Sequence, residues 1–135
     1  MTIHVIPGVL QEEWNPEARA VVDIWQNYTI TAAQFREAIL VKGLSYAKSH
    51  LGRAWIMDAS KARGAFPAEV QKLIETEVFK AFAANGVKYF VTIKSSSVVT
   101  NMSIDRYSAI VGPAGIQLVD VPSMDKAVAW LKAHP

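Results

Sequence analysis

The chain has 135 residues, of which 51% are hydrophobic and 19% are charged, and its formal net charge is +2. This length and composition predict a single folded domain, residues 1–135, and exclude a disordered chain. So small a net charge argues against nucleic acid or an anionic membrane as the main partner, and the absence of cysteine excludes disulfides and thiolate chemistry.

The N-terminal residues 1–7 lack the basic and apolar segments of a secretory signal peptide. No apolar run reaches the roughly 20 residues that a membrane-spanning helix needs. We therefore expect a soluble, cytoplasmic protein without a membrane span.

Residues 9–26 have the pattern of a β-hairpin. The segment Asn15-Pro16-Glu17 is a turn signal, and "RAVVDIW" after it alternates, with one buried and one mixed face expected. The acid pair Glu12-Glu13 is interpreted as an exposed hairpin edge. Trp14 and Trp25 are expected to lie across from each other, either as packing or as an exposed patch for a homodimer.

Four helices are expected after the hairpin. The first begins after Thr31, which has Gln34 three residues later as in a capping box, and Gly43 inside it would allow close packing on a sheet. The second begins at Pro67 and ends near Gly86. The others are a weaker helix over 98–110 and a regular one after Ser123.

Three strands separate these helices, namely "RAWIMDA", "VKYFVTI" and "GIQLVDV". Alternation of strands and helices after a hairpin predicts an α/β fold with a mostly parallel sheet of four to five strands, because parallel neighbours need crossover connections.

Candidate ligand-binding residues follow two of these strands. The carboxyl ends of parallel strands share one edge of a sheet, where ligands usually bind. The hydroxyl, amine and guanidinium groups expected there suit a phosphate or carboxylate. The candidates are Asp58, Ser60, Lys61, Arg63, Lys94, Ser95 and Ser96. The structural alternative is that Asp58 and Ser60 only close a turn and that the cations are solvated.

Enzymatic motifs are missing from the sequence. There is no nucleophile elbow, dinucleotide-binding glycine motif or phosphate-binding loop. His4, His50 and His134 have no second ligand at metal spacing, so we expect no metal and no cofactor. An enzyme with an unrecognised site remains the least favoured interpretation.

From about residue 9 to 133 the chain resembles the STAS domain superfamily, and within it the SpoIIAA-like, STAS/SEC14-like bacterial stand-alone proteins. The resemblance rests on the hairpin followed by "ITAAQFREAI", on "WIMDASKARGAF", and on the ending "IQLVDVPSMDKAVAWLKAH". Anti-sigma factor antagonists of this family carry a phosphorylated serine at the start of the next helix. Here Phe66-Pro67-Ala68-Glu69 stands there instead, so the resemblance implies the fold without the phosphoserine switch.

The resemblance and the candidate residues together predict a non-enzymatic binding or regulatory module, with a protein or a small anionic ligand as partner. The alternative is a small apolar-ligand or lipid-binding protein, in which the helix over 98–110 acts as a lid.

Overall fold

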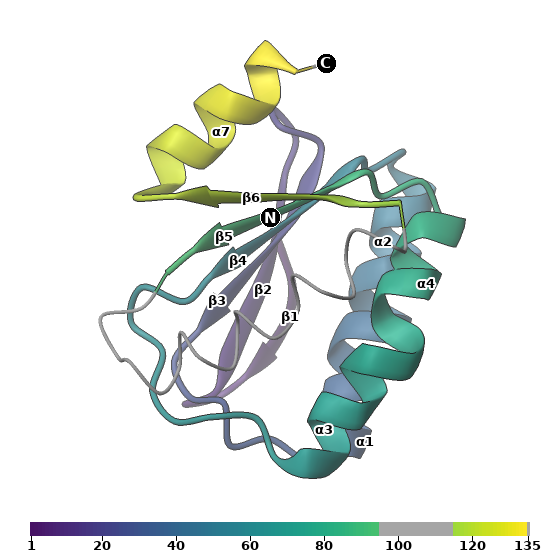
Figure 1. Ribbon diagram of the computed structural model, residues 1–135, viewed down its shortest axis with the longest axis vertical. Coiled ribbons are helices and arrows are strands. Elements are labelled where there is room, and N and C mark those ends of the chain that lie inside the picture. Colours follow the sequence, from purple (N-terminus) through teal and green to yellow (C-terminus); the bar gives the residue numbers. More distant parts are fainter. Residues whose placement is uncertain (95–114, 135) are drawn as a thin grey trace.

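The computed structural model describes residues 1–94 and 115–134, which build one six-stranded mixed sheet with helices on both faces (Figure 1). The strands lie side by side in chain order. They are β1 (Thr2–Ile6), β2 (Leu10–Asn15), β3 (Ala20–Trp25), β4 (Ala54–Asp58), β5 (Tyr89–Ile93) and β6 (Gln117–Val121). The predicted α/β class is confirmed.

The sheet changes direction at β3. Strands β1, β2 and β3 pair antiparallel, whereas β3, β4, β5 and β6 pair parallel. The sheet has one or two strands more than the four to five predicted, because the N-terminal segment also pairs, from Thr2 opposite Glu13 to Ile6 opposite Leu10. Trp14 lies opposite Val21 and not opposite Trp25, so the expected tryptophan pair was wrong. Both tryptophans are buried in the core, so the alternative of an exposed tryptophan patch was wrong too.

Two long helices cover one face of the sheet. The first helix runs through α1 (Ala32–Phe35), the π-helical segment η1 (Arg36–Gly43) and α2 (Leu44–Ser49). The second helix runs through α3 (Ala68–Leu73), the π-helical segment η2 (Ile74–Val78) and α4 (Phe79–Ala84). The predicted capping box is confirmed, since the Thr31 hydroxyl accepts from the Gln34 backbone and the Gln34 side chain accepts from the Thr31 backbone.

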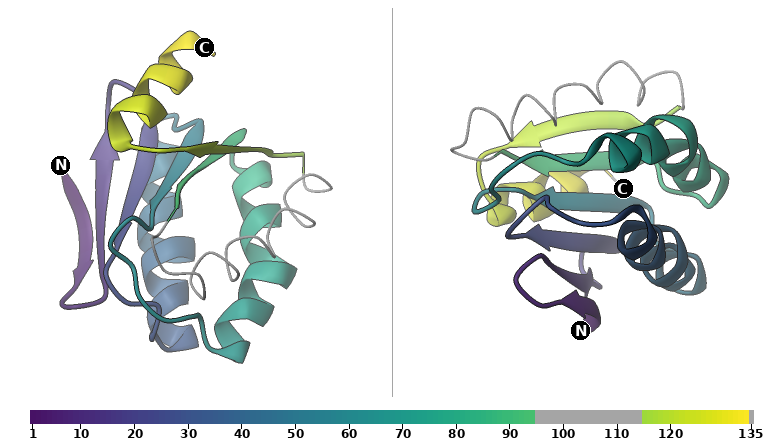
Figure 2. Two further views of the ribbon diagram at one scale, coloured as in Figure 1. Left: turned by 60° about the vertical axis from the view of Figure 1, so that its left-hand side comes forward. Right: turned by 90° about the horizontal axis from the view of Figure 1, so that it is seen from below.

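The opposite face of the sheet carries α7 (Met124–Ala133), as the two views in Figure 2 show. The predicted cap of this helix is confirmed, because the Ser123 hydroxyl accepts a hydrogen bond from the Lys126 backbone. Its buried Ala127 and Leu131 pack with Val22, Ile56 and Val91 in a second core cluster. The mixed face expected for β3 was therefore wrong: both faces of β3 are buried, and so is Asp23.

The helix predicted over 98–110 and the candidate residues Ser95 and Ser96 lie outside the described residues. Among the helices of residues 1–94 and 115–134, none is long and apolar enough to cross a membrane.

Candidate functional site

The carboxyl edge of the parallel strands holds the residues that the sequence singled out. The backbone N–H of Ala59 donates to the Ile93 carbonyl at 2.9 Å, so the ends of β4 and β5 lie together as expected. The Asp58 Oδ1 atom accepts from the Ser60 backbone at 3.0 Å and from the Ser60 hydroxyl at 2.7 Å. These two residues are therefore used in closing a turn.

The cations of this edge are Lys61, Arg63 and Lys94. The backbone of Arg63 is bridged to Asn27 and bonds Gln26 and Tyr28, while its side chain is exposed. Lys94 places its Nζ atom 3.6 Å from an Asp120 carboxylate oxygen. Lys61 is exposed on the loop. Of these three cations, only Lys94 forms an ion pair with a residue of 1–94 or 115–134.

The amino edge of the same strands does gather cations. Arg19, Arg53 and Lys88 directly precede β3, β4 and β5. The Arg53 N–H donates to the Arg19 carbonyl at 2.9 Å, and the Lys88 N–H donates to the Arg53 carbonyl at 2.8 Å. The three residues therefore continue the sheet, on neighbouring strands that are about 4.8 Å apart.

These residues line a hollow of about 520 Å³, which we call the amino-edge groove. That volume lies within the roughly 300–1,000 Å³ of ordinary small-molecule sites. Its lining contains four cations and no carboxylate. The groove is formed by Arg19, Lys48, Leu51, Gly52, Arg53, Ala84, Asn85, Gly86, Lys88 and Tyr89.

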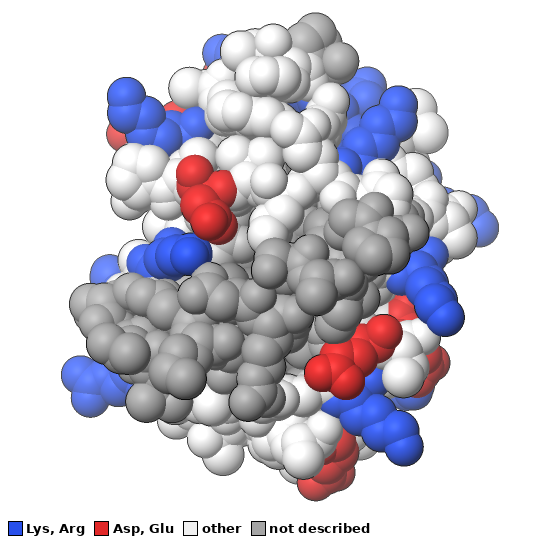
Figure 3. Space-filling view, viewed as in Figure 1, with Lys and Arg blue, Asp and Glu red and all other residues white. Residues whose placement is uncertain are grey.

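The charge of the groove is largely uncompensated. Arg19, Lys48 and Lys88 form no ion pair with any residue of 1–94 or 115–134. In Figure 3 the upper right margin, where α2 and α4 end in Figure 1, shows blue side chains and no red ones. Helix carboxyl ends carry partial negative charge, so part of this positive charge balances α2 and α4.

Arg53 lines the groove and also caps the carboxyl end of α7. Its guanidinium donates to the carbonyls of Leu131 and His134 at the end of α7. A cation at a helix carboxyl end satisfies free carbonyls and opposes the helix dipole. The three remaining cations are thus the ones most available to a ligand.

A second unusual feature is a pair of buried acids that sequence analysis missed. Glu12 was interpreted as an exposed edge residue, but it is 0% exposed, and Asp23 is 3% exposed. They are direct partners on β2 and β3. Glu12 alternates with Leu10 and Trp14, which also face the helices, and this alternation was the available signal.

The surroundings of the acid pair favour its protonated form. Burial raises the pKa of Glu12, and the neighbouring charge of Asp23 raises it further. Burial also raises the pKa of Asp23, opposed by hydrogen bonds from Glu12 and from the Trp55 indole, whose Nε1 atom donates at 2.6 Å. With both groups ionised, both Glu12 carboxylate oxygens and the Asp23 Oδ1 atom would lack a donor. A proton shared between the carboxyl groups supplies one.

Gly43 allows the first helix to approach Glu12 and Trp55 closely. A Cβ atom at Gly43 would lie 2.5 Å from the Glu12 Oε2 atom and 2.7 Å from the Trp55 Cη2 atom. The close approach that the sequence suggested for this glycine is confirmed.

We therefore expect Gly43→Ala to destabilise the protein by about 1–3 kcal/mol, because overpacking outweighs the gain of about 1 kcal/mol in helix propensity. Urea unfolding would measure the change. The control is Ser45→Ala at an exposed position of the same helix, expected to change stability by less than about 0.5 kcal/mol. A Gly43→Ala protein as stable as the wild type would contradict this description of the contact.

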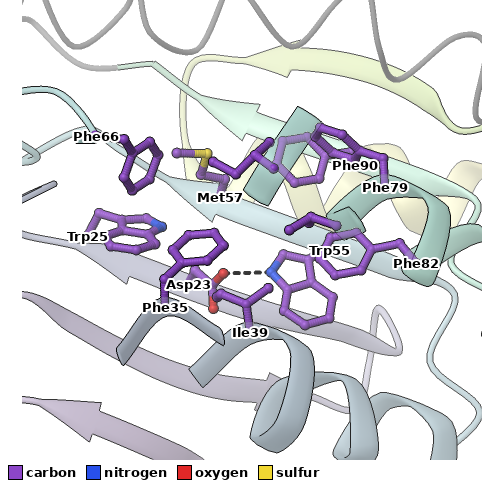
Figure 4. A pocket seen from close by; sticks show the side chains of 12 residues that line it. Asp23, Trp25, Phe35, Ile39, Trp55, Met57, Phe66, Phe79, Phe82 and Phe90 are labelled. Atoms are coloured by element: carbon purple, nitrogen blue, oxygen red, sulfur yellow. Dashed lines mark hydrogen bonds between the residues drawn. The ribbon is translucent and has the colours of Figure 1, made fainter. Parts of the chain in front are cut away.

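An aromatic cavity lies beside the acid pair, between the sheet and both long helices (Figure 4). In Figure 4 the Asp23 carboxylate is hydrogen-bonded to Trp55 and surrounded by aromatic rings. Both π-helical segments contribute to the wall, through Ile39 of η1 and through Ile74 and Val78 of η2. π-Helical turns are rare and often mark functional positions.

The size of this cavity limits what it can hold. Its volume is about 30 Å³. A dry cavity of about 150 Å³ is known to hold benzene, so a lipid chain has no ready space here.

No protein-family model, no curated protein and no solved structure matches the chain. In the described ranges, no group of three or more His, Cys, Asp or Glu side chains is placed to hold a metal ion.

Proposed function

We infer that the protein is a non-enzymatic binding module for a small anionic ligand, which it takes up in the amino-edge groove. The observation that carries this proposal is the set of four cations around one hollow whose lining has no carboxylate. Guanidinium and ammonium groups form strong, charge-assisted hydrogen bonds to phosphate and carboxylate oxygens.

The arrangement favours a ligand with more than one negative charge. Arg19 and Lys88 extend from strands on either side of the Arg53 strand, and Lys48 approaches from the end of α2. A ligand with a diphosphate or several carboxylates can contact cations from two of these elements at once. The regulatory, STAS-like role predicted from the sequence belongs to the same proposal, with ligand occupancy as the signal passed to a partner.

The test is isothermal titration with inorganic phosphate, pyrophosphate and citrate. We expect pyrophosphate to bind more tightly than phosphate, with an affinity that falls as salt is added. The double variant Lys48→Gln/Lys88→Gln should lower the affinity about a hundredfold, since each of the two charge-assisted contacts is worth about 1.4 kcal/mol, which is about tenfold in affinity. Lys72→Gln/Lys126→Gln removes the same charge elsewhere and should leave the affinity nearly unchanged.

The competing position is the carboxyl edge. Alanine at Lys61, Arg63 and Lys94 removes its cations while leaving the groove intact. Loss of binding in that triple variant, with normal binding in the groove variant, would move the site to the carboxyl edge. No binding of any of the three probes would contradict the proposed function.

A further inference from the structure

Glu12 and Asp23 are the only buried carboxyl groups among the described residues, and the first helix lies directly over them. The two strands of the hairpin hold them as partners, so each side chain faces the other. The helix backbone at Gly43 leaves no room for a methyl group above the Glu12 Oε2 atom. A movement of the Glu12 carboxyl group away from Asp23 would therefore change the contact between Glu12 and the first helix at Gly43.

The surroundings offer the pair a hydrogen-bond donor but no countercharge. Trp55 of β4 donates its indole N–H to Asp23. None of the ion pairs within residues 1–94 and 115–134 involves Glu12 or Asp23. Other titratable or charged groups lie on the elements packed around the pair. On the strands and just after them these are His4, which lies opposite Glu12, Tyr28 and Asp58. On η1 they are the exposed Arg36, Glu37 and Lys42.

We propose that the Glu12–Asp23 pair is a proton-operated latch for the first helix. With a proton between them, the two carboxyl groups bond each other and the helix packs against Glu12 at Gly43. When that proton leaves to solvent, two like charges remain beneath the helix without a cation. Their repulsion and their need for water then separate the segment 36–49 from β2 and β3.

Burial raises the pKa of both acids, so the proton is retained at neutral pH and its loss becomes easier as the pH rises. The first helix ends beside Lys48 and Gly52, in the wall of the amino-edge groove. Release of the helix would thus also alter the groove. That consequence rests on the proposed function, whereas the latch itself does not.

Hydrogen–deuterium exchange of the full chain between pH 6 and 9 tests the latch. Exchange rates are first corrected for the intrinsic effect of pH. If opening releases one proton, the opening constant of segment 36–49 should rise by up to about tenfold per pH unit. Helix α7 lies on the other face of the sheet and is the internal reference, with an opening constant that should stay nearly constant.

Glu12→Gln keeps the shape of the side chain and replaces the shared proton by a permanent N–H donor, so the pH dependence in segment 36–49 should disappear. Asp23→Asn provides the same test if the first variant does not fold. Three results would overturn the proposal: no pH dependence in the wild type, an equal dependence in α7, which indicates global unfolding, or a dependence that persists in the folded variant. None of these readouts requires an anionic ligand, so a groove that binds nothing would leave this test intact.

Discussion

The free energy of unfolding is expected to fall as the pH rises from about 5 to about 9, by up to about 1.4 kcal/mol per pH unit. Glu12 has an ordinary pKa of 4.5 when it is exposed, and burial beside Asp23 raises this pKa in the folded protein. A group whose pKa is raised by folding contributes its full stabilisation at pH values below its pKa in the unfolded chain. That stabilisation is lost as the pH rises towards its pKa in the folded protein. Asp23 is shifted in the same direction.

Urea unfolding at a series of pH values would measure this dependence. Glu12→Gln has no proton to release, so its curve should approach that of the wild type near pH 5 and exceed it by several kcal/mol, about 3–5, at pH 8–9. Glu13→Gln removes a carboxyl group from the opposite face of the same strand and should run parallel to the wild type. A wild-type stability that rises with pH would contradict the buried, protonated pair.

Trp55→Phe is expected to destabilise the protein by about 2–4 kcal/mol, from lost packing in the core and from the loss of a hydrogen bond to a charged group. Trp55 is 1% exposed, stacks on Phe82 with ring centroids 4.2 Å apart, and donates to Asp23. Removal of that donor should also raise the pKa of Asp23 further, since the indole hydrogen bond lowers it in the wild type.

Denaturant unfolding of Trp55→Phe at pH 7 would measure the expected loss of stability, with Trp130→Phe as the matched control. Trp130 is partly exposed on α7 and stacks on His134 with ring centroids 3.9 Å apart. The same substitution there should cost less than about 1 kcal/mol. Equal costs at the two positions would mean that the indole–carboxylate bond contributes nothing measurable.

Most of the described elements could be predicted because their signals are local. Thr31 and Gln34 form the capping box that their spacing predicts, and Gly86 has the left-handed backbone, with φ of 89°, that its place after a helix predicts. The continuous apolar run of β4 predicted a central strand, and its first four residues are buried. The STAS-like resemblance stays a prediction.

Burial in the hairpin was harder to predict because it depends on distant parts of the chain. Glu12 is covered by a helix that begins about twenty residues later and approaches only where Gly43 lacks a side chain. A charged residue in a strand usually faces water, since burial of a charge without a partner is costly. The partner here is another acid, which no charge-matching rule would select.

The candidate groove was missed because the usual rule for parallel sheets directs attention to the carboxyl edge. A cation stands directly before each of three apolar strands, at Arg19, Arg53 and Lys88. That repetition is visible in the sequence. Its meaning depends on register, because only pairing of the three strands without a shift places the cations side by side.

The most direct test of the central claim is a titration of isotopically labelled protein with pyrophosphate, followed by amide chemical shifts in nuclear magnetic resonance spectra. Binding in the amino-edge groove predicts the largest, saturable shifts at residues 19, 51–53 and 85–89, with little change at residues 58–66. Saturable shifts confined to residues 58–66, or no saturable shift anywhere, would contradict the proposed groove.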